Sequence, residues 1–110
     1  GAPEWLEAEL AAVPGVLQSF VYGDEGQGVQ ALLFAPMLAA DPHGEARLRA
    51  CNQNLPEYAR LNGWQFIKTP FSREAGELTA NGRLRRDTIR QLRLGADDPA
   101  GSRPLSKELS

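Results

Sequence analysis

The segment from Val29 to Pro36 constrains the fold of this chain most strongly, because it is apolar on both of its alternating faces. Successive residues of an extended segment point to opposite sides. Both sets are apolar here, with Val29, Ala31 and Leu33 set against Leu32 and Phe34. A strand of this kind is buried on both faces. The segment therefore predicts a central strand with structure packed on each side of it.

Two further segments have the composition of strands in the same sheet. Residues Val16 to Tyr22 are rich in β-branched and aromatic residues, and the glycine-rich turn Gly23 to Gly28 follows them. Residues Trp64 to Thr69 have a similar composition and stop at Pro70, which has no amide proton to give to a sheet. We therefore expect a three-stranded sheet.

Helices are expected before and between these strands. Residues Pro3 to Val13 open with a proline and acidic residues, which suit the first turn of a helix, and then carry one apolar stripe. A second helical stretch begins at Asp41-Pro42 and keeps helical spacing of its apolar residues until Pro56. Residues Glu57 to Leu61 would form a short further piece.

The last part of the chain divides into a loop, a helix and a tail. Residues Phe71 to Gly82 are rich in Ser, Glu, Gly, Thr and Asn, which predicts an exposed loop. A helix from Leu84 to Leu94 follows, with Ile89 and Leu92 facing inward. Residues Gly95 to Ser110 have almost no large apolar side chains, so we expect a flexible polar tail.

The length favours one domain of the α+β class. A chain of 110 residues has room for a single hydrophobic core. Three strands and about three helices make a small three-stranded sheet flanked by helices, within residues 1–94. Hydrophobic residues make up 42% and charged residues 24%, which is typical of soluble globular proteins.

Composition argues against several classes of function. A net charge of -2 and a pI near 5.4 argue against a nucleic-acid partner. The single cysteine, Cys51, and the single histidine, His43, supply neither a disulfide nor a set of metal ligands, so no metal site is expected. Cys51 is interpreted as a small buried hydrophobe. The apolar stretch Ala31 to Ala40 is too short to span a bilayer and no leader precedes it, so we expect a cytoplasmic protein.

The segment Gly76 to Ile89 carries the features that suggest chemistry. Its Asn81-Gly82 pair predicts a tight turn, which presents Arg83 at the junction of a loop and a helix. A guanidinium group binds phosphate or carboxylate through paired hydrogen bonds, and the first turn of a helix adds free backbone donors. The segment therefore predicts a site that recognises anions.

This segment, GELTANGRLRRDTI, resembles the last signature of the adenylate-forming (AMP-binding) superfamily, most closely that of its long-chain fatty acid CoA ligases. The signature of that family reads roughly Leu-Thr-x-x-x-Lys-x-x-Arg. Residues 3–10 resemble the helix that follows the family's hinge, and residues 54–60 with 70–72 resemble the approach to its lysine loop. Three motifs in one order, covering residues 3 to 92, argue against a chance match.

The resemblance implies that residues 1–94 are the C-terminal lid domain of an ATP-dependent, AMP-forming acid–thiol ligase. In this family the lid closes over a large N-terminal domain, and a lysine in its loop bridges the acid carboxylate and the nucleotide phosphate while the acyl-adenylate forms. The acyl group then passes to the thiol of CoA. Arg83 stands at the lysine position and is therefore the implied catalytic residue, and the neighbouring loop residues implied to lie near the nucleotide are Thr79, Asn81, Gly82 and Arg86.

The same resemblance assigns the substrates and partners to the full-length enzyme. ATP, CoA and a fatty acid would be its substrates, Mg²⁺ its metal, and the N-terminal adenylate-forming domain the partner of this chain. The fragment alone is expected to hold none of these ligands and to be inactive. An association of the parent enzyme with a membrane surface is compatible with a fatty substrate.

The arginine at the lysine position leaves other readings open. Arg83 keeps the positive charge but places its donors differently from a lysine. The chain is alternatively a catalytically silenced lid-fold interaction module, or the lid of an acyl-AMP ligase that serves a carrier protein. Arg90 and Arg93 are expected on a solvated helix face. Four aromatic residues are expected in the core or at a domain interface: Trp5, Trp64, Phe66 and Tyr58.

Overall fold

The structure is a computed structural model that describes residues 2–95. Its elements in chain order are α1 (Ala2–Ala11), β1 (Gln18–Asp24), β2 (Gly28–Phe34), α2 (Pro36–Ala40), α3 (Gly44–Gln53), the short 3₁₀ helix η1 (Glu57–Ala59), β3 (Gly63–Phe66) and α4 (Arg86–Leu94). The α+β class with a small three-stranded sheet is confirmed. The chain divides into two compact units, one up to Pro70 and one from Phe71 onward, and each is described by itself.

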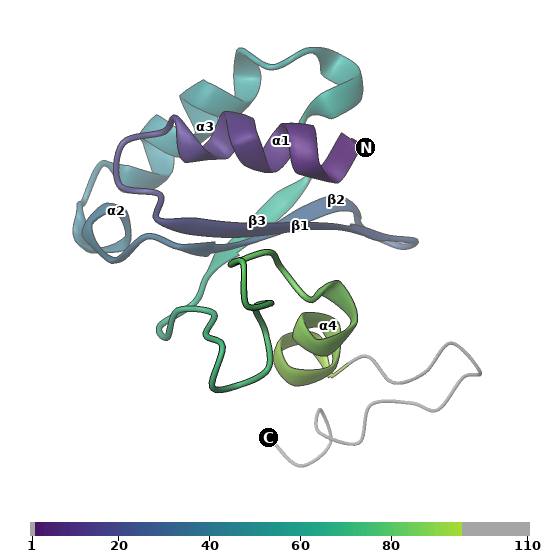
Figure 1. Ribbon diagram of the computed structural model, residues 1–110. Coiled ribbons are helices and arrows are strands. Elements are labelled where there is room, and N and C mark those ends of the chain that lie inside the picture. Colours follow the sequence, from purple (N-terminus) through teal and green to yellow (C-terminus); the bar gives the residue numbers. More distant parts are fainter. Residues whose placement is uncertain (1, 96–110) are drawn as a thin grey trace. The chain divides into compact units, whose positions relative to one another are not determined.

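The sheet of the first unit has the strand order β1-β2-β3, so β2 is central as expected (Figure 1). Strands β1 and β2 form an antiparallel hairpin in which Gln18 pairs with Phe34. Strand β3 runs parallel to β2 and pairs Gly63 with Gln30. A parallel neighbour requires a crossover connection, and α2 and α3 lie in it.

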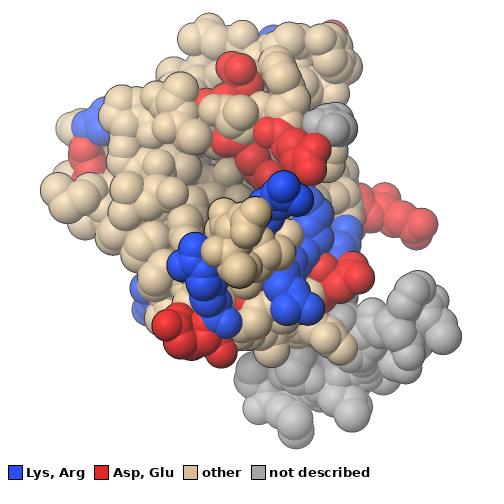
Figure 2. Space-filling view, viewed as in Figure 1, with Lys and Arg blue, Asp and Glu red and all other residues tan. Residues whose placement is uncertain are grey.

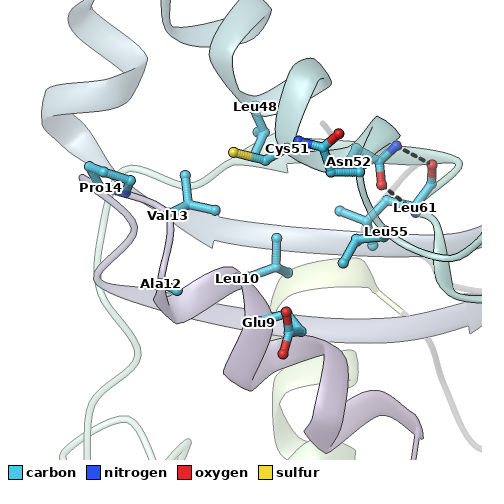
Figure 3. A pocket seen from close by; sticks show the side chains of 11 residues that line it. Glu9, Leu10, Ala12, Val13, Pro14, Leu48, Cys51, Asn52, Leu55 and Leu61 are labelled. Atoms are coloured by element: carbon cyan, nitrogen blue, oxygen red, sulfur yellow. Dashed lines mark hydrogen bonds between the residues drawn. The ribbon is translucent and has the colours of Figure 1, made fainter.

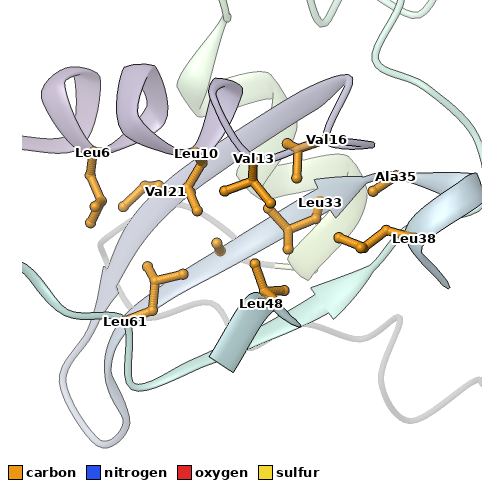
Figure 4. Close-up of a cluster of buried hydrophobic side chains, with 11 residues drawn as sticks. Leu6, Leu10, Val13, Val16, Val21, Leu33, Ala35, Leu38, Leu48 and Leu61 are labelled. Carbon is orange, nitrogen blue, oxygen red and sulfur yellow. The ribbon is translucent and has the colours of Figure 1, made fainter. Parts of the chain in front are cut away.

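Burial along β2 agrees with the pattern of two apolar faces. Leu32 is 1% exposed and Leu33 is fully buried, although these consecutive residues point to opposite sides of the sheet. On one side, α1 and α3 pack against the strands (Figure 4). The buried cluster there consists of Leu6, Leu10, Val13, Val16, Val21, Ala31, Leu33, Ala35, Leu38, Leu48 and Leu61. This cluster is the hydrophobic core of the first unit.

The helical connection between β2 and β3 differs from the predicted one. The expected strand ends at Phe34, and α2 begins at Pro36, because proline fits the first turn of a helix. The next helix, α3, spans only Gly44–Gln53. Gly44 lies against α2, where a Cβ atom would come within 2.0 Å of the carbonyl oxygen of Leu38. The two short helices therefore meet at a position that only glycine fits.

Side-chain hydrogen bonds fix the ends of these elements. Asn52 of α3 binds both backbone groups of Leu61, through its Nδ2 at 2.9 Å and its Oδ1 at 2.8 Å. On the outer edge of the sheet, the N–H of Val21 donates to the carboxylate of Glu7 at 2.7 Å. This bond satisfies a donor that an edge strand would otherwise leave open.

The aromatic residues only partly follow the expectation of burial. Trp64 packs against the core, and its indole N–H donates to Glu45 at 3.2 Å. Phe66 also packs against the core. Tyr58, in contrast, is 87% exposed in η1, so it does not lie in the core, and the other expected place, a domain interface, stays a prediction.

The second unit holds a loop and helix α4. The helix starts at Arg86, two residues later than predicted, because Leu84 pairs with Leu78 in an antiparallel bridge. Ile89 is fully buried as expected, but Leu92 is 58% exposed, so its inward placement was wrong. Arg93, one helical turn after Ile89, takes the inward position instead.

Gly95 ends α4 in a left-handed conformation, with φ of 67°. The predicted flexible tail, residues 95–110, lies outside the described residues beyond this glycine. Among residues 2–95, none of the helices has the length and apolarity that crossing a bilayer requires.

Candidate functional site

The predicted turn at Asn81-Gly82 is the tip of a short hairpin. The N–H of Gly82 donates to the carbonyl of Thr79 at 2.9 Å, and Gly82 has φ of 83°. On either side, the bridge between Leu78 and Leu84 closes the hairpin. A tight turn followed by one left-handed residue is a common three-residue hairpin loop, and glycine adopts that conformation without strain. The sequence therefore fixes the tip one residue before Arg83.

The backbone of Arg83 is held on both sides by Thr79. The N–H of Arg83 donates to Thr79 Oγ1 at 3.0 Å, and the carbonyl of Arg83 accepts from the N–H of Thr79 at 2.8 Å. The side chain is exposed, and its guanidinium has no hydrogen bond or ion pair within residues 2–95. Arg83 is thus a fixed backbone position that presents an unpaired positive charge, as anion recognition requires.

A buried ion pair connects the base of the hairpin to α4. Glu77 is 1% exposed, and its carboxylate accepts hydrogen bonds from Arg93 Nε at 2.5 Å and Nη2 at 3.1 Å. The N–H of Ser72 donates to the same carboxylate at 3.1 Å. Arg93 also lies over the ring of Phe71, 4.9 Å from its centroid. These contacts hold the loop and the helix together as one unit.

The ion pair also sets the charge state of Glu77. The hydrogen bonds from Arg93 lower the pKa of Glu77 below its ordinary value of 4.5, burial opposes the shift, and the Ser72 N–H adds to it. The carboxylate therefore stays ionised at neutral pH. The expectation that Arg93 lies on a solvated helix face was wrong, because only 16% of its side chain is exposed. Arg90 is half-buried and has an interaction within the chain.

The other predicted site residues have distinct places around the tip. Asn81 and Gly82 are exposed on the turn itself. Thr79 is half-buried, and its hydroxyl accepts the Arg83 N–H, so its observed role is to hold the loop. Arg86 is half-buried at the first position of α4 and has an interaction within the chain. Figure 2 shows that Lys and Arg side chains gather on the visible face over α4 and the loop before it.

Arg73 is a residue of the tip that sequence reasoning missed. Its Nε donates to the carbonyl of Ala80 at 3.3 Å, so this exposed side chain lies across the turn. No periodicity or motif marks such a contact, because the two residues face each other only once the loop has folded back on itself. Arg85, by comparison, makes only backbone bonds, one of them to the carbonyl of Glu77 at 2.8 Å.

The first unit contains a separate apolar cavity of about 250 Å³ (Figure 3). Its wall is formed mainly by apolar side chains of α1, the loop after α1, α3 and the segment before β3: Leu10, Val13, Leu48, Leu55 and Leu61. Cys51 is half-buried on this wall and packs against the core, which agrees with a small hydrophobe rather than a nucleophile. Within residues 2–95, no three His, Cys, Asp or Glu side chains lie together as metal ligands would.

Comparisons with known sequences give no assignment. No protein-family model matches the chain, and no curated protein matches it.

Solved structures do share its fold. One is the adenylation domain of a carboxylate reductase from Mycobacterium chelonae, with a TM-score of 0.66 and 24% identity over 80% of this chain and 16% of that one. Another is the A-PCP didomain of a carboxylic acid reductase from Segniliparus rugosus in complex with AMP, with a TM-score of 0.63 and 25% identity over 80% of this chain and 14% of that one. A third is the ATP-bound RpMatB-BxBclM chimera B1, with a TM-score of 0.55 and 22% identity over 81% of this chain and 18% of that one.

Two of these neighbours are the adenylation domain and the A-PCP didomain of carboxylate reductases, and two of the structures contain AMP or ATP. The chain spans less than a fifth of the length of each. It therefore has the fold of a part of these adenylation enzymes.

Proposed function

We propose that this chain is the C-terminal lid domain of an AMP-forming acid–thiol ligase and that Arg83 is its mobile cation. The observation that carries the proposal is the unpaired guanidinium of Arg83 on a hairpin whose backbone is held by Thr79. The fold shared with adenylation domains supports the same reading. On this proposal the partner of the chain is the large adenylate-forming domain of its own parent protein.

The chemistry of adenylation explains why a cation is needed. A carboxylate oxygen of the acid attacks the α-phosphorus of ATP, the bond from that phosphorus to the bridging oxygen of the β-phosphate breaks, and pyrophosphate leaves with the bonding electron pair. Attacking and attacked groups are both negative, so a positive charge between them lowers their repulsion and holds them in line. Arg83 would supply that charge when the lid closes.

The described residues contribute positive charge and positioning to this step. They offer no group of three or more His, Cys, Asp or Glu side chains that would hold Mg²⁺. On the proposal, ATP, Mg²⁺, the acid and CoA are bound by the large domain, and the isolated chain has no turnover. On the same proposal, the parent enzyme works in the cytoplasm or at a membrane surface.

The finer assignment is a long-chain fatty acid as the acid and CoA as the thiol. It rests on the signature around Arg83 and on the order of the three motifs. A second candidate acceptor is the thiol of a carrier protein, and the A-PCP arrangement of one structural neighbour favours it. Both candidates share the adenylation step and differ only in the thiol.

The test uses the whole protein that carries this chain. Acid-dependent pyrophosphate release from ATP is measured without a thiol, for short, medium and long-chain fatty acids and for aromatic acids. AMP formation is then measured with CoA or with a carrier protein. Faster turnover with CoA on long-chain acids supports the finer assignment. Turnover only with the carrier protein favours the second candidate. No pyrophosphate release with any acid would contradict the adenylation role and favour a silenced lid that serves interaction.

A further inference from the structure

Arg73 and Arg83 flank Gly82 at the tip of the hairpin, although they are ten positions apart in the chain. The Nη2 atom of Arg73 lies 3.6 Å from the place that a Cβ on Gly82 would occupy. Arg83 is the next residue after that glycine. The tip therefore has the guanidinium of Arg73 beside Gly82 and a second arginine, Arg83, at the next position of the chain.

Both groups keep free donors in the described part of the chain. Arg73 uses its Nε for the carbonyl of Ala80, and its two Nη groups have no partner among residues 2–95. The guanidinium of Arg83 has none there either. The exposed acids nearby in sequence, Glu74 and Asp87, form no ion pair with them in this structure. The positive charge at the tip is thus unbalanced, since guanidinium groups do not lose their protons.

We infer that Arg73 and Arg83 together bind the phosphate chain of the nucleotide, in the form of a diphosphate. The inference rests on the proposed function, which assigns only Arg83. A carboxylate has two oxygens and is satisfied by one guanidinium fork, whereas two arginines at one turn suit an anion with several oxygens and more than one negative charge. A diphosphate meets both conditions. Because Gly82 has no side chain, the diphosphate has room to approach the backbone.

The hydrogen bond from Arg73 to Ala80 also preorganises the Arg73 side chain for binding an anion. Its bond to Ala80 already restricts the side chain in the free protein, so less rotational freedom is lost when the anion binds. On this account Arg73 recognises the leaving pyrophosphate portion, and Arg83 bridges from it toward the reacting carboxylate. Arg73 is therefore a further binding residue of the same site.

The experiment titrates inorganic pyrophosphate into the 110-residue chain and follows the amide resonances of Gly82 and Arg83 by NMR. The test variants are Arg73→Gln and Arg73→Lys. The matched control is Arg49→Gln, which removes the same charge from an exposed arginine of α3 that lies 3.8 Å from Glu45. We expect Arg73→Gln to weaken pyrophosphate binding about threefold to fivefold, as for one exposed ion pair. Arg73→Lys should keep most of the affinity, and the control should change it less than about twofold.

Two results would overturn the inference. One is the absence of pyrophosphate binding by the wild-type chain, and the other is equal binding by wild type and Arg73→Gln. If Arg73→Gln loosens the hairpin, seen as fast exchange of the Arg83 amide, Arg73→Lys decides: weak binding by a Lys variant with an intact hairpin contradicts the two-arginine arrangement. None of these results decides the adenylation role of Arg83, which is tested separately by acid-dependent pyrophosphate release in the whole protein.

Discussion

Thr79 holds Arg83 by both of its backbone groups: the Arg83 N–H donates to the Thr79 hydroxyl at 3.0 Å, and the Thr79 N–H donates to the Arg83 carbonyl at 2.8 Å. The side chain of Arg83 remains unpaired within the described residues. A residue that is fixed in its backbone and free in its side chain suits a group that must meet a ligand elsewhere. The relationship explains why a threonine four positions before the cation matters.

Thr79→Val removes the hydroxyl acceptor while keeping the shape of the side chain. The N–H of Arg83 then loses its partner, and the hairpin should be destabilised by about 1 kcal/mol, the usual net value of one hydrogen bond. Hydrogen exchange of the Arg83 amide measures this, with an expected acceleration of about fivefold. Thr79→Ser keeps the acceptor and should exchange like wild type. Equal exchange rates in all three proteins would contradict the role given to Thr79.

The ion pair between Glu77 and Arg93 should be the most sensitive feature of the second unit. Arg93→Met leaves the buried carboxylate without its partner and should lower the free energy of unfolding by about 3–5 kcal/mol. The double change of Glu77→Leu with Arg93→Met should recover most of that loss, because no unpaired charge remains. Urea unfolding measures both. Arg49→Met, at an exposed pair, is the control and should cost less than about 1 kcal/mol.

Acid should weaken the same ion pair. The pKa of Glu77 is lowered in the folded protein, chiefly by Arg93, so the folded state favours the ionised carboxylate. Its contribution to stability is complete well above the ordinary pKa of 4.5 and is lost as the pH falls through the lower folded value. The difference in unfolding free energy between wild type and Glu77→Gln should therefore be constant between about pH 6 and about pH 7, where the carboxylate is fully ionised in both states. It should shrink below about pH 4. A difference that grows on acidification would reverse the sign that this account requires.

The need for glycine at the hairpin tip can be tested by comparing alanine substitutions at Gly82 and at a glycine of ordinary backbone conformation. Gly82 has φ of 83°, so Gly82→Ala should strain the turn and cost about 1 kcal/mol of stability. Gly23 of β1 has ordinary φ and no atom within 4 Å of an added Cβ, so Gly23→Ala is the matched control and should be neutral or slightly stabilising. Thermal unfolding of the two variants compares them directly. A Gly82→Ala protein as stable as the control would show that the left-handed turn is not needed.

Features of the fold that depend on local signals were predicted from the sequence. The central position of β2 follows from its two apolar faces, and the tip of the hairpin follows from Asn81-Gly82. The helix α2 was missed because Pro36 reads equally well as the end of a strand and as the start of a helix.

The parts of the site that were not predicted from the sequence are contacts between residues that are distant in the chain. Glu77 and Arg93 are 16 positions apart, and each alone has the appearance of a solvated charge. Only the folded loop brings them together, and the pairing explains why Arg93 rather than Leu92 faces inward. Arg73 was missed for the same reason, because its partner is the backbone of Ala80 and no sequence pattern marks a backbone contact.

The central claim is that Arg83 is the cation of acyl-adenylate formation, and one measurement tests it most directly. Acid-dependent pyrophosphate release is compared in the whole protein for wild type, Arg83→Lys and Arg83→Ala, with Arg49→Ala as the control. We expect Arg83→Ala to lose about 10²–10³-fold in rate, while Arg83→Lys and the control keep activity near that of wild type. Release by Arg83→Ala at the wild-type rate, or release that appears only in Arg83→Lys, would contradict the claim.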